Sequence, residues 1–151
     1  MDTKIQKSIL AGIVGTAIMT VVMMLAPIMG IPKMSPPEML SGMLGIPVSI
    51  GWAMHFMIGI IFAFAYTYLY SFKWRISNIW LKGAVFGLIV FVFAQIMMAI
   101  IGAIMPMPKI ENSLILTMTG SLIGHLIFGM AVSKTVGNVY CSDKSCEPKT
   151  T

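Results

Sequence analysis

The chain is dominated by four long apolar stretches that are separated by short polar segments. The stretches cover residues 8–29, 48–70, 82–105 and 114–133. Each is close to the roughly 20 residues that a helix needs to cross the hydrocarbon core of a bilayer. The joints between them are short and polar, and the chain has no amphipathic helices that would cover four such helices in a soluble domain. The pattern therefore predicts an all-α integral membrane bundle of four transmembrane helices, which together form a domain of residues 1–135.

The composition agrees with a membrane protein. Hydrophobic residues make up 58% of the chain and charged residues only 10%, whereas a soluble domain carries about 25% charged residues. The chain is also rich in methionine, with 16 residues of this type.

The basic residues predict the orientation of the bundle. Eight of the ten Lys and Arg residues fall on one side of the predicted membrane: Lys4, Lys7, Lys73, Arg75, Lys82, Lys134, Lys144 and Lys149. By the positive-inside rule this side is the cytoplasm, so both termini are expected there, in the bacterial inner membrane. The net charge of +5 then reflects topology, and no nucleic-acid partner is expected. An aromatic belt is expected on the same side, formed by Tyr66, Tyr68, Tyr70, Trp74 and Trp80.

A short helix is predicted in the first outer loop, over residues 36–44. Ser35 is placed as its N-cap, Pro36 as its first residue and Glu38 as the partner of a capping box. Gly45 is expected to end it. Such a helix would lie at the outer interface of the membrane.

Two segments of the chain resemble each other. The first apolar stretch opens with "LAGIVG" and the third with "LKGAVFG", and they end near "GIPKM" and "PMPKI". Each is followed by a helix with a histidine between small residues, in "GWAMHFMIG" and "SLIGHLIFG". The repeat predicts two tandem helix hairpins related by a pseudo-twofold axis along the membrane normal.

Small residues one or two turns apart indicate where helices approach closely. The pairs are Gly12 and Thr16, Gly51 and Gly59, Gly83 and Gly87, and Ser121 and Gly129. The remaining polar groups at membrane depth are Thr16, Thr20 and Gln95, for which we expect hydrogen bonds between helices.

The two histidines are the candidate functional residues. His55 and His125 are the only histidines in the chain, and a polar side chain in lipid is costly, so both are expected to face the bundle interior. The small residues beside them would line the same site: Gly51, Gly59, Ser121 and Gly129.

Three roles remain open for the histidines. Each ring could donate a hydrogen bond to a neighbouring helix and so fix its register. Together they could be the axial ligands of a haem b, because imidazole is the usual axial ligand and small residues admit a porphyrin. Counting residues at 1.5 Å each places His55 about 6 Å closer to the outside than His125, which weakens a shared iron.

The third role is copper handling. Met19 and Met23, and Met39 and Met43, form M-x3-M pairs that place two thioethers on one helical face. Thioethers are soft ligands that select Cu(I), and His55 is expected at the same depth. The pair is similar to one that membrane copper-uptake proteins carry inside a helix. The alternative is that methionine only fills gaps as an adaptable apolar residue.

Enzyme chemistry is not expected. The apolar stretches contain no acidic residue, and the chain has no nucleophile elbow, phosphate loop or H-E-x-x-H motif. The sequence instead favours an accessory subunit or helper of a membrane complex, which would bind other membrane proteins or itself. Residues 136–151 are expected to form a flexible cytoplasmic tail in which Cys141 and Cys146 stay reduced.

With the histidine blocks and the paired "P-K" ends, the chain resembles an uncharacterised family of small four-helix bacterial inner-membrane proteins. The resemblance covers most of residues 8–133. It implies the fold and the membrane placement, and it brings no activity and no site residue with it.

Overall fold

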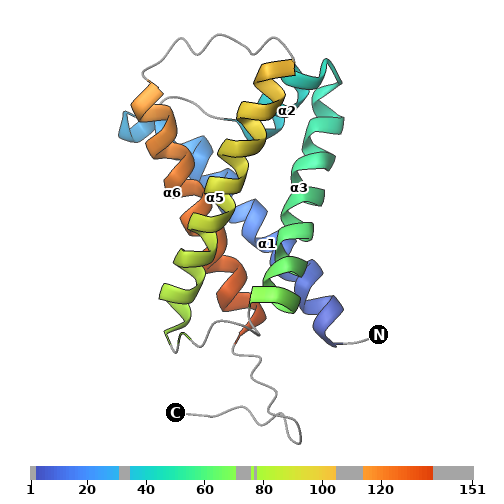
Figure 1. The fold of residues 1–151 in the computed structure, drawn as a ribbon, viewed down its shortest axis with the longest axis vertical. Coiled ribbons are helices and arrows are strands. Elements are labelled where there is room, and N and C mark those ends of the chain that lie inside the picture. The colour runs from blue at the N-terminus through green and yellow to red at the C-terminus, as the bar shows by residue number, and fades with distance from the viewer. Residues whose placement is uncertain (1–2, 31–34, 71–75, 77, 105–113, 138–151) are drawn as a thin grey trace, which may run out of the picture.

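The computed structural model describes residues 3–30, 35–70, 76, 78–104 and 114–137, and every regular element in this part of the chain is helical (Figure 1). The helices are α1 (Thr3–Leu25), α2 (Pro36–Leu44), α3 (Val48–Ala65), α5 (Ile79–Ile104) and α6 (Leu114–Val136). A 3-10 turn, η1 (Ala26–Met29), follows α1, and a π-helical turn, η2 (Tyr66–Tyr70), follows α3.

Four of these helical segments are long and apolar enough to cross a membrane: Lys4–Ile28, Val48–Tyr68, Ile79–Ile104 and Leu114–Val136. The prediction of an all-α bundle is therefore confirmed, and the chain is a multi-pass membrane protein. Several helices run past the apolar stretches by about one turn, because the helical hydrogen bonds continue through the flanking polar residues. Cys141 and Cys146 lie outside the described residues.

The short helix predicted over residues 36–44 is present as α2, but its capping box is not. The Ser35 side chain makes no capping hydrogen bond, and only its carbonyl oxygen accepts one, from the Met39 N–H at 2.9 Å. Pro37 at the second helical position lacks an N–H, so one of the two donors that a capping side chain could bind is missing. Gly45 ends the helix as predicted, with a φ of 63° that a residue with a side chain rarely adopts.

The four long helices pack in the order α3, α1, α6, α5. α1 packs along both α3 and α6, and α5 packs along α6, whereas α3 and α5 barely touch. One contact between them is the edge-to-face pair Phe62 and Phe93, with ring centroids 5.6 Å apart. The start of α1 and the end of α6 lie at one end of the bundle, which we call the terminal end, and α2 lies at the other (Figure 1).

The helix contacts within the two hairpins correspond position by position. Gly12 of α1 lies against Ile60 of α3, as Gly83 of α5 lies against Met130 of α6. A Cβ at Gly12 would be 2.9 Å from the Ile60 nitrogen, and one at Gly83 would be 2.7 Å from the Met130 Cα. Neither distance is tolerable, so both hairpins depend on the same close approach of two backbones.

The second pair of small positions behaves in the same way. Gly59 of α3 contacts the Thr16 hydroxyl and the Gly12 carbonyl, while Gly129 of α6 contacts the backbones of Gly83 and Gly87. The predicted strips of small residues therefore form the helix contacts of both hairpins. This correspondence supports the tandem repeat that the sequence motifs predict.

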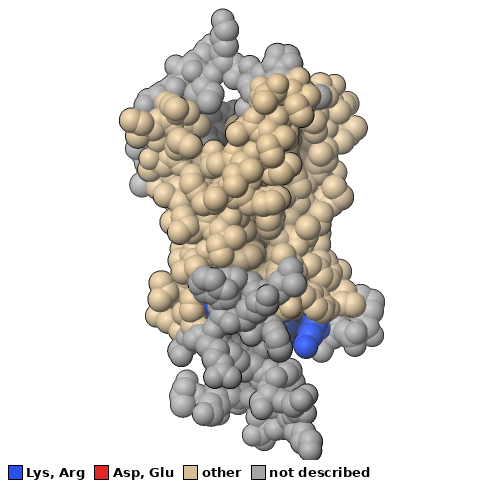
Figure 2. Space-filling model, in the orientation of Figure 1, with Lys and Arg blue, Asp and Glu red and all other residues tan. Residues whose placement is uncertain are grey.

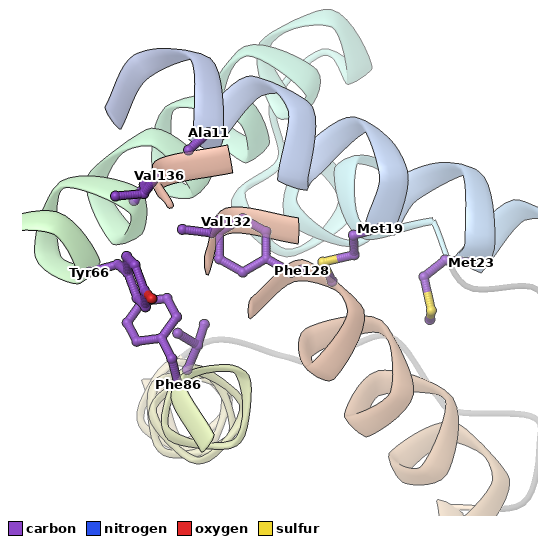
Figure 3. Packing of buried hydrophobic residues seen from close by; sticks show 10 residues of the cluster. Ala11, Met19, Met23, Tyr66, Phe86, Phe128, Val132 and Val136 are labelled. Carbon is purple, nitrogen blue, oxygen red and sulfur yellow. The ribbon is translucent and has the colours of Figure 1, made fainter. Parts of the chain in front are cut away.

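The apolar core lies between α1, α6, α5 and the end of α3 (Figure 3). Its members are Ala11, Met19, Met23, Ala63, Tyr66, Phe86, Val90, Phe128, Val132 and Val136. Tyr66 was expected in the aromatic belt, and that prediction is wrong, because its side chain is only 1% exposed. Its hydroxyl donates to Ser133 Oγ at 2.7 Å, since Ser133 donates its own proton to the Ile79 carbonyl.

The described charged residues are distributed unevenly along the bundle. Lys4 and Lys7 lie in the first turns of α1, Lys82 in the first turns of α5 and Lys134 near the end of α6, which places all four toward the terminal end. The Lys134 Nζ lies 4.9 Å from the ring centre of Trp80, which is half exposed. Glu38 belongs to α2 at the opposite end. The face shown in Figure 2 is uncharged between the two ends where residues are described.

Gly87→Ala is expected to destabilise the bundle, although alanine is the better helix former by about 1 kcal/mol. The added Cβ would lie 2.8 Å from the Leu126 Cα, against a backbone that cannot move away alone. Thermal unfolding of the purified protein in mild detergent measures the effect. Gly42→Ala, at an exposed position of α2, is the control and should not lower the unfolding temperature. An unfolding temperature of Gly87→Ala equal to or above that of the wild type would contradict the close packing.

Candidate functional site

A partly open cavity of about 300 Å³ lies between the helices, toward the α2 end. Each of the described α-helices contributes to its wall, which includes side chains of both α3 and α5, the two helices that scarcely touch. The lining residues are mostly apolar, and the polar ones are Thr16, His55, Gln95, Thr117, Ser121 and His125. The volume is at the lower end of the range of about 300–1,000 Å³ for small-molecule sites.

Both histidines line this cavity. His55 is only 9% exposed, and His125 is partly buried, with Phe91 edge-to-face against its ring at 5.8 Å between centroids. The structure thus brings together two residues that are far apart in the sequence and that the repeat made equivalent.

The hydrogen bond of His55 determines which of its nitrogens carries the proton. Thr20 Oγ1 donates its proton to the Thr16 carbonyl at 2.8 Å. It can therefore only accept from His55 Nε2, which lies 3.2 Å away. Nε2 carries the hydrogen and Nδ1 keeps the lone pair. This is the hydrogen bond to a neighbouring helix that was one of the predicted roles.

His125 is held by its own helix. Its Nδ1 lies 2.7 Å from the Ser121 carbonyl oxygen, which can only accept, so Nδ1 carries the hydrogen and Nε2 keeps the lone pair. The prediction that this ring donates to a neighbouring helix is wrong. Its N–H instead donates to the carbonyl one turn earlier in α6. The position in α5 that corresponds to Thr20 holds Phe91, whose ring has no acceptor to offer.

The two rings therefore present the same chemistry to the cavity, through opposite nitrogens. Each uses its N–H within the protein, and the remaining nitrogens, Nδ1 of His55 and Nε2 of His125, have no hydrogen-bond partner among the described residues. Both nitrogens are Lewis bases. A ligand of this site should be a metal centre or a hydrogen-bond donor, and not a bare carbonyl acceptor.

Six methionines line the cavity: Met19, Met23, Met39, Met43, Met98 and Met118. Both M-x3-M pairs are thus on its wall, together with His55. The side chains of Met19 and Met23 point from α1 toward α6 (Figure 3) and are 7% and 2% exposed. They fit there because α6 has a glycine opposite: a Cβ at Gly124 would be 2.9 Å from the Met23 Sδ.

The small residues expected beside the histidines divide between two roles. Gly59 and Ser121 line the cavity. Gly51 instead lies against the Pro37 carbonyl of α2, and Gly129 lies against α5. Gly51 and Gly129 therefore make room for a neighbouring helix backbone and not for a ligand.

The other polar groups at the depth of the cavity make fewer hydrogen bonds between helices than expected. Thr16 Oγ1 has no hydrogen-bond partner among the described residues and lies directly against Gly59, so the predicted bond between helices is wrong for Thr16 and right only for Thr20. Gln95 lines the cavity.

Sequence reasoning missed Met98, Thr117 and Met118 as wall residues. None belongs to a spaced pair, so no motif singled them out.

Within the described part of the chain, no three His, Cys, Asp or Glu side chains come together as a metal site. Any metal bound in the cavity would therefore need donors of another type as well, and the described wall offers thioethers together with uncharged hydroxyl and amide oxygens.

Thr20→Val is expected to destabilise the protein, because it leaves the buried His55 Nε2–H without an acceptor. A lost partner of this kind costs about 1–3 kcal/mol. Thermal unfolding in detergent should show a lower midpoint for Thr20→Val than for Thr119→Val. The control removes a hydroxyl that is exposed and bonds only to its own helix, at the Ile115 carbonyl. Equal midpoints for the two variants would mean that the Thr20–His55 bond contributes nothing.

Comparison with known proteins leaves the function open. No curated protein matches the chain, and no solved structure matches it. Residues 2–144 match the family of unknown function DUF6789, which covers nearly the whole chain and agrees with the resemblance seen in its histidine blocks. The protein is a member of this family of unknown function.

Proposed function

We propose that this protein is a non-enzymatic accessory protein of the membrane that holds a small ligand within the bilayer, in the cavity between its helices. The observation that carries the proposal is the pair of imidazoles on one cavity wall, each with a free nitrogen. Ionisable groups at membrane depth are expensive and mark functional sites by default. Two of them on one cavity wall are better explained by a ligand in that cavity than by two separate structural bonds.

The arrangement of Ser121 and His125 argues against an enzyme with a serine nucleophile. Ser121 Oγ lies 3.5 Å from His125 Nδ1. That nitrogen already carries a proton, which it donates to the Ser121 carbonyl, so it cannot take the proton of the hydroxyl as a general base must. No described acidic side chain lines the cavity. Binding is the chemistry that the described wall residues support.

The small described surface outside the membrane spans supports an accessory role. Among the described residues, α2 is the one regular element outside the four candidate spans that is longer than a single turn. Recognition of a partner would therefore run through the faces of membrane helices, by close packing of small and apolar side chains. The partner would be another membrane protein or a second copy of this chain.

Haem b is the second candidate ligand, and His125 favours it. Its Nδ1–H is held by a carbonyl and its Nε2 is free, as in histidines that ligate metals. His55 does not match, because its Nε2 faces Thr20. Its free Nδ1 is adjacent to the ring carbon that bears the side chain, where a flat macrocycle cannot approach. A Soret band in the purified protein that is lost in His125→Ala would establish haem, and a colourless preparation would exclude it.

We further propose that the terminal end of the bundle faces the cytoplasm, in the bacterial inner membrane. The four described lysines toward that end support this orientation. A green fluorescent protein fused to the C-terminus should fluoresce, and alkaline phosphatase fused there should be inactive. The same reporters placed after residue 30 should give the opposite results. An active phosphatase at the C-terminus would reverse the topology.

Filling the cavity should remove its ligand. Ala94 of α5 lines the cavity, and Ala94→Trp would occupy its space, whereas Ala99 of the same helix is exposed. The wild type and Ala99→Trp are expected to copurify with a ligand, and Ala94→Trp is expected to lack it. Native mass spectrometry from mild detergent, with metal and lipid analysis of the same samples, makes the comparison. Equal ligand content in the two variants would contradict a ligand in this cavity.

A further inference from the structure

The described donors on the cavity wall are all uncharged. Six thioethers and two imidazoles line it, together with the oxygens of Thr16, Gln95, Thr117 and Ser121, and none of the described wall residues is a carboxylate, thiolate or ammonium group. Thioether and imidazole donors suit soft metal ions, whereas Mg²⁺ and Ca²⁺ require oxygen ligands with negative charge. All of these donors are uncharged when the imidazoles are in the tautomers described above, so the charge of a bound ion is not neutralised. A monovalent ion is then far less costly to bury than a divalent one.

We propose, on the basis of the cavity function above, that the ligand is a single Cu(I) ion held at the α1 side of the cavity by Met19, Met23 and His55. All three residues line the same cavity. Met19 and Met23 lie one turn apart on α1, and Thr20 of the same turn holds the His55 ring through its hydroxyl. Met43 of α2, which is 6% exposed, lines the same cavity and supplies a further thioether.

The tautomer of His55 suits an ion and not a macrocycle. With Nε2–H donated to Thr20, the ring is fixed and Nδ1 is left to bind. A hydrogen bond from the second ring nitrogen is the usual way in which a protein orients a histidine ligand. A compact ion can reach Nδ1 beside the ring carbon that bears the side chain. Thr20 is accordingly a positioning residue for the metal, in addition to its effect on stability.

The test must separate thioether chemistry from packing, because methionine also fills apolar space. Leucine has nearly the same volume and no sulfur, and such exchanges usually cost under about 1.5 kcal/mol. The informative variant is Met19→Leu with Met23→Leu, both on the cavity wall. The matched control is Met24→Leu with Met57→Leu, whose side chains are 48% and 53% exposed and do not line the cavity.

The experiment titrates the full-length protein in mild detergent with Cu(I), under anaerobic conditions with ascorbate, against a chromophoric Cu(I) chelator. We expect one Cu(I) per chain for the wild type and for the Met24/Met57 control. Thr20→Val should weaken binding by about 10–100-fold, as outer-shell changes do. The Met19/Met23 variant should weaken it at least as much, with circular dichroism and an unfolding midpoint like those of the control.

Three results would overturn the inference. They are a wild type that binds no Cu(I), a Met19/Met23 variant with wild-type affinity, and a loss of affinity that is equal in the control. If the wild type binds no Cu(I) but Ala94→Trp still loses a copurifying lipid, the cavity function stands and only the copper assignment is wrong. If the wild type binds no Cu(I) and Ala94→Trp has the same ligand content as the wild type, both proposals are wrong.

Discussion

The structure depends on the close approach of two helix backbones within each hairpin. Glycines at corresponding positions, Gly12 and Gly83 in the first helices and Gly59 and Gly129 in the second, leave no room for a side chain at either crossing. In a bilayer there is no hydrophobic driving force between helices, so such backbone contact is a principal source of association. The same crossings determine where the histidines lie. His55 is one turn from Gly59, and His125 is one turn from Gly129.

The two hairpins are joined unequally, and the cavity is the consequence. α1 packs closely on α6, where Gly124 receives the Met23 thioether. The contact that the pseudo-twofold would make equivalent, between α3 and α5, is nearly absent. Space therefore remains between the hairpins, and α2 brings Met39 and Met43 to its wall. The asymmetry extends to the rings, since Thr20 holds His55 while Phe91 only packs against His125.

Much of this arrangement follows from the sequence. The lengths of the apolar stretches predict the helices, and the spacing of Gly12, Gly59, Gly83 and Gly129 predicts the crossings, because these signals are local. Features that depend on distant partners could not be predicted. Tyr66 is buried because Ser133, on another helix, can accept its proton, and nothing near Tyr66 in the sequence indicates this. Likewise, spacing alone cannot tell that His125 bonds to its own helix.

The cavity presents two imidazoles in opposite tautomers, each with a free lone pair. Long-range proton–nitrogen correlation spectra of the protein labelled with ¹⁵N-histidine in detergent micelles report this directly, with His55→Gln and His125→Gln variants to assign the signals. We predict a neutral ring protonated at Nε2 for His55 and a neutral ring protonated at Nδ1 for His125. Two rings in the same tautomer, or a doubly protonated ring at neutral pH, would contradict the account.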